Sequence, residues 1–229
     1  MEDIKYCNTH TKMIEKFDLL NKAALEDDTL ILEGTITQGY GSEILTLLKM
    51  IEEKYSKKKD KTKKVNVFID SSGGDIPTGV RIYDALSNSK LEVCTLIGER
   101  AHGIAGIIFL AGKERLMMHY SEWSFKDTIA NAIIENKTEN KKVSEYIIDK
   151  SALNNRIKEI IDSHFSATDI FLSNMANKPI DFFEYKNALD YNIATGKMEK
   201  IWDPVIRYNS EIDVKELRME NFLNKSIKR

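Results

Sequence analysis

The chain has 229 residues, of which 42% are hydrophobic and 31% are charged, and its formal net charge at pH 7 is −2. This length allows one large domain or two small ones, and the near-neutral charge excludes a general attraction to nucleic acid or to anionic membranes. The longest apolar run, residues 104–111, is far shorter than the roughly 20 residues of a membrane-spanning helix.

The N-terminus and the cysteines indicate the compartment. The first ten residues, MEDIKYCNTH, lack the charged-then-apolar layout of a signal peptide. Cys7 and Cys94 are too few and too far apart for a disulfide framework or a zinc site. We therefore expect a soluble intracellular protein that needs no metal and no cofactor. It would lie in the cytoplasm, or in an organelle interior such as the plastid stroma if a transit peptide has been removed.

Hydrophobic periodicity predicts the first elements in chain order. Residues 12–27 are expected to form a short helix or a docking segment, residues 29–36 a strand, and residues 42–55 a helix. The lysine-rich run 57–64 is interpreted as a solvated loop rather than a nucleic-acid contact, because no aromatic residues are interleaved with its lysines.

The most informative segment is 65–112, where strands and helices alternate. The predicted order is a strand (65–70), a helix (77–86), a strand (92–98) and an apolar helix that begins after the turn 99–106. This alternation is typical of a mostly parallel sheet covered by helices. Each strand leads into its helix through a glycine-containing turn, so backbone N–H groups of both turns meet at one end of the sheet. Such groups bind anions or oxyanions.

The rest of the chain carries weaker signals. Short strands are predicted at 114–118 and 122–125, and a last helix at 181–191; Thr168-Asp169 has the form of a helix cap. Residues 137–165 are expected to form a long amphipathic helix, in which Tyr146, Leu153 and Ile160 lie seven residues apart. Its length favours projection from the domain and packing on another subunit, with ordinary core packing as the alternative.

These patterns divide the chain into five parts. They are an N-terminal segment (1–28), a head (29–136), the long interface helix (137–165), the remainder of the head (166–198) and a charged C-terminal extension (199–229).

Three segments, in this order, resemble the proteolytic subunit of the Clp protease, ClpP. The first is Asp70-Ser71-Ser72-Gly73-Gly74-Asp75-Ile76-Pro77-Thr78-Gly79 with Ile82-Tyr83-Asp84-Ala85-Leu86, the second is 95–112, and the third is Asn187-Ala188-Leu189-Asp190-Tyr191-Asn192-Ile193. Their spacing is nearly that of the family, and together they span about 25–196. The resemblance implies an α/β fold of the ClpP/crotonase type, with stacked ββα units and a projecting long helix.

The family's chemistry uses a Ser nucleophile, a His base and an Asp that orients the His. By the resemblance these positions fall on Gly103, Lys126 and Ala176. No Ser occurs between Lys90 and Tyr120, and His119 lies seven residues from the His position, on the order of 23 Å along a strand. Loss of such a triad costs roughly 10⁶ in turnover. The chain is therefore interpreted as a non-catalytic member that resembles the ClpR type of subunit.

The resemblance also implies a partial binding site and an assembly. Gly73 and Ile104 would donate oxyanion-hole N–H groups, Gly74 would line a peptide groove, and strand edges near 71–76 and 122–126 would accept an extended peptide. Residues 127–131 replace the family's glycine-rich segment. The implied assembly is a homo- or hetero-oligomeric heptameric ring, stacked on a ring with active ClpP subunits, with an AAA+ unfoldase as partner and no nucleic acid or membrane.

Two other functions remain open from the residues. An active endopeptidase would use a rearranged pair, Ser124 and Lys126, which lie on the same side of a strand. A crotonase-like enzyme acting on acyl-CoA would use the glycine-rich turn 98–106. His102, beside position 103, is interpreted as a polar turn residue, because no nucleophile is present for it to activate.

Overall fold

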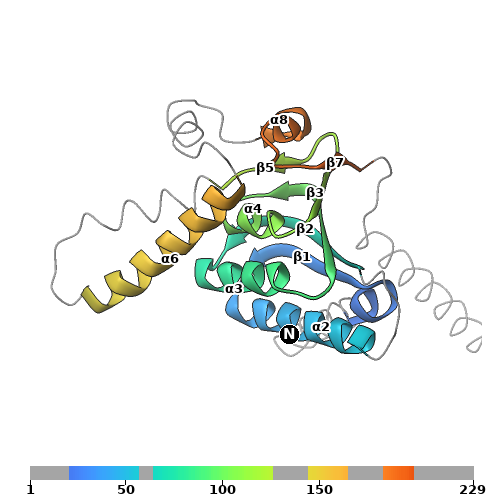
Figure 1. The fold of residues 1–229 in the computed structure, drawn as a ribbon, viewed down its shortest axis with the longest axis horizontal. Helices are drawn as coiled ribbons and strands as arrows, with labels where there is room; N and C mark the ends of the chain where they lie inside the picture. The colour runs from blue at the N-terminus through green and yellow to red at the C-terminus, as the bar shows by residue number, and fades with distance from the viewer. Residues whose placement is uncertain (1–20, 57–63, 126–143, 165–182, 199–229) are drawn as a thin grey trace, which may run out of the picture.

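A computed structural model describes residues 21–56, 64–125, 144–164 and 183–198. A single sheet organises these residues (Figure 1). Its strands are β1 (Thr29–Ile36), β2 (Lys64–Gly74), β3 (Glu92–Ala101), β4 (Glu114–Met117), β5 (Glu122–Trp123), β6 (Phe183–Glu184) and β7 (Gly196–Lys197). The main order is β1-β2-β3-β4-β7, and all neighbours along it are parallel. The segment β5 extends the sheet beside the end of β3 and pairs antiparallel with β6.

The helices follow the strands as the periodicity predicts. They are α2 (Gln38–Ser56), α3 (Ile76–Ser87), α4 (Ile104–Phe109), α6 (Ser144–His164) and α8 (Tyr185–Asp190). Residues 21–27 are also helical, which covers the described end of the predicted helix at 12–27. The predicted α/β class with a mostly parallel sheet is confirmed. The cap at Thr168-Asp169, most of the lysine-rich run and the C-terminal extension lie outside the described residues.

The core lies where the central strands meet the helices. Val65, Val67, Phe68 and Ile69 of β2 are all buried, as expected for a parallel strand covered on both faces. The helices α3 and α4 pack closely at Gly79, where a Cβ atom would lie 2.1 Å from Cγ1 of the Ile104 side chain. A glycine at this position therefore allows α4 to seat against α3, and α4 carries the second glycine turn.

The long helix α6 corrects one expectation. Its described C-terminal half packs against the chain's own core, since Ile157, Ile160 and Ile161 are buried and Leu153 packs against them. Arg156 also pairs with Asp84 of α3, with Nη2 2.6 Å from Oδ1. Ile160 is thus a core residue rather than a subunit-interface residue. The N-terminal half of α6 extends away from the sheet (Figure 1), and the side chain of Tyr146 lies outside the described residues.

A buried arginine attaches the C-terminal part of the head to β4. Arg115 is 7% exposed, and its guanidinium donates hydrogen bonds to three backbone carbonyls. The acceptors are Ile193 (2.7 Å), Gly112 (3.0 Å) and Asn192 (2.8 Å). These bonds hold the loop between α8 and β7 against the sheet.

Asn192 stands where the ClpP motif that this segment resembles has a glycine. It follows the C-cap of α8 with a φ of 57°, in the left-handed region. Asn is the residue that most often replaces Gly there, because its short polar side chain tolerates this conformation. The family's glycine at this position is therefore replaced without loss of the turn.

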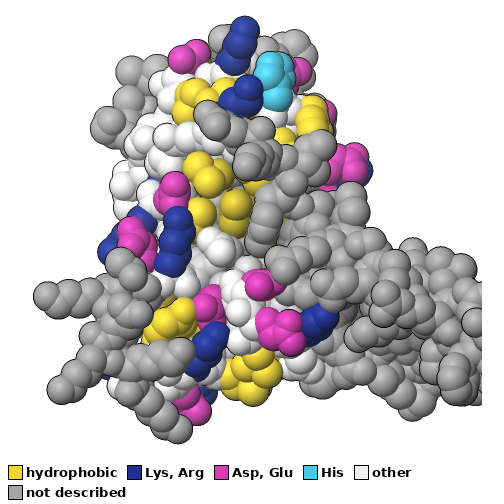
Figure 2. Space-filling view, turned by 90° about the vertical axis from the view of Figure 1, so that its right-hand side faces the viewer, with side chains coloured by type: hydrophobic (Ala, Val, Ile, Leu, Met, Phe, Trp, Pro, Cys, Tyr) yellow, Lys and Arg dark blue, Asp and Glu magenta, His cyan; other side chains and the backbone are white. Residues whose placement is uncertain are grey.

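The face shown in Figure 2 has no broad field of one charge among the described residues. On the face shown in Figure 2, acidic, basic and hydrophobic side chains are interspersed. In the described part of the chain, no helix is long and apolar enough to cross a membrane.

Candidate functional site: two abutting glycine turns

The first turn joins β2 to α3 and is stabilised by its polar side chains. The carboxylate of Asp75 caps α3 by accepting a 3.0 Å hydrogen bond from the N–H of Thr78. Ser71 is 1% exposed; its hydroxyl donates to the carbonyl of Gly34 at 2.5 Å and accepts from the N–H of Gly73 at 3.0 Å. The Ser71 hydroxyl is therefore a structural link between β1 and β2, not a nucleophile.

The second turn joins β3 to α4 through His102 and Gly103. The N–H of His102 donates to the carbonyl of Ser71 at 2.9 Å, which fastens this turn to the first one. Gly103 is the N-cap of α4, with φ 54° and ψ −125°. This backbone conformation lies outside the regions that residues with a Cβ atom adopt readily.

The two turns touch each other. A Cβ atom on Gly73, whose φ is 97°, would lie 2.9 Å from the carbonyl oxygen of His102 and 3.4 Å from the nitrogen of Ile104. The predicted meeting of Gly73 and Ile104 at one end of the sheet is therefore present in the structure. A side chain at position 73 would separate the turns.

Two expected roles at the first turn need revision. The N–H of Gly73 is directed to Ser71, so it is not aimed at an incoming oxyanion. Gly74 is exposed, with a φ of 150°, and its Cα is pressed against β1: a Cβ atom there would lie 2.2 Å from the carbonyl oxygen of Ile36. Gly74 thus permits the close approach of β1 and β2.

The expected free strand edges are also occupied. Gly73 and Gly74 pair with β1, while Ser71 pairs with Ala101 of β3. On the other strand, Trp123 pairs with both β3 and β6. At these described positions an extended peptide would have to displace a strand of the chain itself.

The histidines near the turns differ in environment. The side chain of His102 is 15% exposed, and its Nε2 lies 3.5 Å from Oε2 of Glu122 on β5. His119 is exposed on the turn that follows β4. A strand was predicted at Glu122, but its pairing with His102 was not foreseen, because it depends on the register of β5 beside β3.

The remaining predicted site residues lie elsewhere. Ser124 is 5% exposed, and its N–H donates to the carbonyl of Ala101 at 3.0 Å, beside the second turn. Lys126 and Ala176 lie outside the described residues. Within the ranges that are described, no group of three or more His, Cys, Asp and Glu residues is placed to hold a metal ion.

Cys94, the described cysteine, lies at the opposite end of β3. It is 1% exposed, and burial raises the pKa of its thiol to about 12. A thiol with such a pKa holds its proton at neutral pH, so Cys94 is not a nucleophile.

An α/β sheet whose two glycine turns abut, the second opening a helix, is the architecture of serine peptidases of the Clp type. The family model for Clp protease matches residues 12–191, and the chain belongs to this family.

The individual relatives are distant. The chain is 24% identical over 177 residues to the ATP-dependent Clp protease proteolytic subunit of Ligilactobacillus salivarius, which covers 76% of this chain and 85% of that protein. It is 27% identical over 124 residues to the subunit of the same name from Cyanophora paradoxa, covering 50% and 60%. Among solved structures, a mutant ClpP1 of Listeria monocytogenes superposes with a TM-score of 0.60 at 17% identity, over 79% of this chain and 96% of that one. The predicted ClpP-like fold is confirmed.

Proposed function

We propose that the chain is a non-catalytic subunit of an ATP-dependent Clp protease, with a structural and regulatory role in the proteolytic ring. The observation that carries this proposal is Gly103. It stands in the strained turn between β3 and α4, where the family's nucleophile would stand, and it has no side chain to attack a carbonyl.

The neighbouring hydroxyls offer no replacement. The hydroxyl of Ser71 donates its proton to the carbonyl of Gly34. A Ser124–Lys126 pair would need a desolvated lysine, and the adjacent carboxylate of Asp127 would instead favour the charged form of Lys126. Loss of the Asp position at Ala176 completes the case for a pseudo-peptidase of the ClpR type.

The assembly is the second half of the proposal. The related proteins are proteolytic subunits of an ATP-dependent protease, which supports an oligomeric ring and an ATPase partner of the AAA+ class. The projecting N-terminal half of α6 offers a helix for contact with a neighbouring subunit. We expect the ring to be heptameric and to stack on a ring that contains active subunits.

The test combines mass and activity on one purified fraction. Light scattering should give a mass near seven or fourteen times 26.3 kDa, and the same fraction should neither cleave a fluorogenic peptide nor react with a serine-directed fluorophosphonate. A monomer would contradict the ring, while turnover would contradict the non-catalytic assignment. A ring that forms only after addition of an active Clp subunit would support the hetero-oligomeric form.

A single substitution tests whether the nucleophile alone is missing. We expect Gly103→Ser to leave peptide turnover at background, because a serine without a base to take its proton remains a weak nucleophile. The variant should also lose about 1–3 kcal/mol of stability, since φ 54° is unfavourable for a residue with a Cβ atom. The measurements are the fluorogenic assay and urea denaturation. Turnover in this variant would show that a base is already in place.

A further inference from the structure

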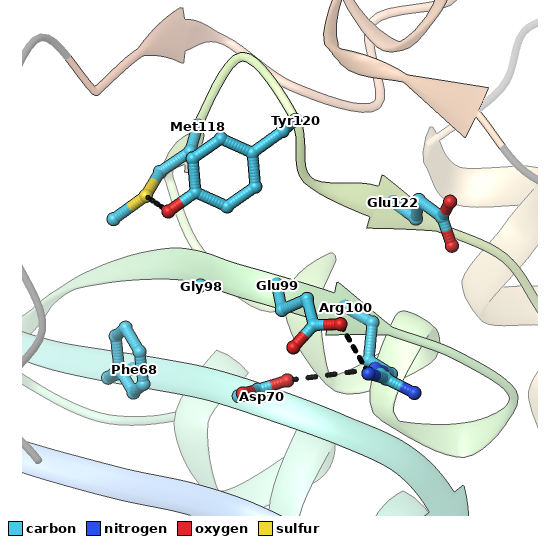
Figure 3. Close-up of a pocket in the computed structure, with 8 residues that line it drawn as sticks. All are labelled: Phe68, Asp70, Gly98, Glu99, Arg100, Met118, Tyr120 and Glu122. Carbon is cyan, nitrogen blue, oxygen red and sulfur yellow. Dashed lines mark hydrogen bonds and ion pairs between the residues drawn. The ribbon is translucent and has the colours of Figure 1, made fainter. Parts of the chain in front are cut away.

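A pocket of about 500 Å³ opens beside the site, between the ends of β2 and β3 and the segment from β4 to β5. Its lining residues are Phe68, Asp70, Gly98, Glu99, Arg100, Met118, Tyr120 and Glu122 (Figure 3). A volume of this size is typical of pockets that bind ligands or side chains.

The floor of this pocket is apolar. Phe68 and Met118 are nearly fully buried there. The ring of Phe68 lies directly against Gly98, where a Cβ atom would be 2.5 Å from Cζ. Tyr120 forms one wall, is 59% exposed, and donates from its hydroxyl to the sulfur of Met118 at 2.9 Å. The aromatic wall provides a surface on which a cationic group can pack.

The rim of the pocket carries an excess of negative charge. It has three carboxylates, from Asp70, Glu99 and Glu122, against the one guanidinium of Arg100. In Figure 3 the guanidinium lies between two of these carboxylates, paired with Glu99 and 4.0 Å from Oδ1 of Asp70. Burial raises the pKa of Asp70 despite this neighbour, so its carboxylate is poorly solvated. A second cation in the pocket would compensate this charge.

The strand β7, which precedes the C-terminal extension in the sequence, ends beside this pocket. The strands β4 and β7 are parallel, so their carboxyl ends lie at the same edge of the sheet. The chain continues from β4 into Met118 and Tyr120, which line the pocket, and from β7 into Met198, whose N–H donates to the carbonyl of Met117 at 3.0 Å. Met198, the last described residue before the C-terminal extension, therefore lies at the pocket's own edge of the sheet.

The end of this extension has the complementary charge. Residues 221–229, NFLNKSIKR, contain Lys225, Lys228 and Arg229 and no acidic side chain. A random-coil chain as long as the segment from Met198 to Lys225 has a root-mean-square end-to-end distance of about 28 Å. Attachment to the same chain gives the basic residues an effective concentration on the order of millimolar, so that weak ion pairs suffice for occupancy.

We propose that the pocket between β2, β3 and β5 is a binding site for cationic side chains, and that its occupant is the basic stretch 221–229 of the chain's own C-terminal extension. The apolar stems of lysine or arginine would pack against Tyr120, while their charged ends pair with Glu122 and Glu99. The extension would thereby compete with any cationic partner for this pocket. The inference does not depend on whether the chain cleaves peptides or forms a ring.

Photo-crosslinking tests this proposal on the full-length chain. With p-benzoylphenylalanine in place of Tyr120, we expect irradiation followed by mass spectrometry to identify cross-links to residues 221–229. The matched control carries the same photoreactive residue at Met50, an exposed position on α2, and should not capture this stretch. Absence of the cross-link from position 120, or equal capture from both positions, would overturn the proposal.

Charge variants and isotope mixing separate the alternatives. Both charge variants carry the photoreactive residue at position 120. In the first, Glu99→Gln with Glu122→Gln should reduce the cross-link yield by roughly fivefold or more. In the second, neutralisation of Lys225 and Lys228 should have the same effect. An unchanged cross-link yield in both variants would exclude a role for charge and overturn the proposal.

Isotope mixing distinguishes a contact within one chain from a contact between two copies. In a mixture of ¹⁵N-labelled and unlabelled chains, cross-links within one chain are uniformly labelled. Cross-links of mixed label would identify a second copy as the occupant and overturn the intrachain contact.

Discussion

Replacement of Arg115 by methionine is expected to lower the free energy of unfolding by about 2–4 kcal/mol, because three carbonyls, two of them in buried hydrogen bonds, would lose their donor. The guanidinium donates to Gly112, Asn192 and Ile193, and methionine fills a similar volume without any N–H group. The measurement is the midpoint of urea denaturation at one fixed protein concentration. Loss of these bonds would also release the loop that leads into β7.

The matched control for this prediction is Arg156→Met. Arg156 pairs with Asp84 and Glu159, but these groups are largely solvated, with side chains 38–65% exposed. Exposed ion pairs contribute about 0–1 kcal/mol, so this variant should unfold close to the parent. Equal losses in the two variants would show that burial of Arg115 does not set its contribution.

Gly74→Ala is expected to destabilise the chain by about 3 kcal/mol or more, or to prevent folding, because its Cβ atom would overlap the backbone of β1. The new atom would lie 2.2 Å from the carbonyl oxygen and 2.7 Å from the nitrogen of Ile36, and a φ of 150° adds strain for alanine. Backbone atoms of a paired strand cannot move aside as a flexible side chain can. Circular dichroism with urea denaturation gives the measurement.

Gly39→Ala is the matched control for Gly74→Ala, and we expect it to cause no loss of stability. Gly39 lies in the first turn of α2, and nothing lies within 4 Å of a Cβ atom built there. Alanine in a helix is favoured over glycine by up to about 1 kcal/mol, so this variant should be equally or more stable than the parent. Destabilisation of similar size in both variants would contradict the assignment of Gly74 to a close backbone approach.

Both predictions concern residues whose roles are decided by partners far away in the sequence. Arg115 bonds to residues nearly eighty positions later, and Gly74 is pressed against Ile36. From the sequence, Arg115 is one charge in a short strand, and Gly74 is one of two glycines in a turn.

The order of strands and helices through Phe109 was predictable from the residues alone. The apolar run 65–70 and the helix around Ile82 and Leu86 have strong periodicities, and the glycine-containing turns mark their ends. Most predicted boundaries lie within a few residues of those in the structure, with larger differences at the start of α2 and the end of β2. The short strands β6 and β7 were not predicted, because a strand of two residues is too short to show a hydrophobic periodicity.

Part of the candidate site was also predictable from the order of the strands and helices. The meeting of Gly73 and Ile104 follows from parallel strands whose carboxyl ends lie at one edge of a sheet. The direction of the Gly73 N–H toward Ser71, and the pairing of β1 with both glycines, depend on register. Register is set by contacts between strands and cannot be read from one strand.

The sequence by itself determined the fold class, the family resemblance and the glycine at position 103, because these depend on local pattern and on residue identity. Only the tertiary structure showed that Ile160 belongs to the core, that the strand edges beside the turns are already paired, and that three carboxylates and one guanidinium share a pocket. The physical reason is that burial, pairing and charge balance are properties of neighbours in space, which come from β2, β3, β5 and α6.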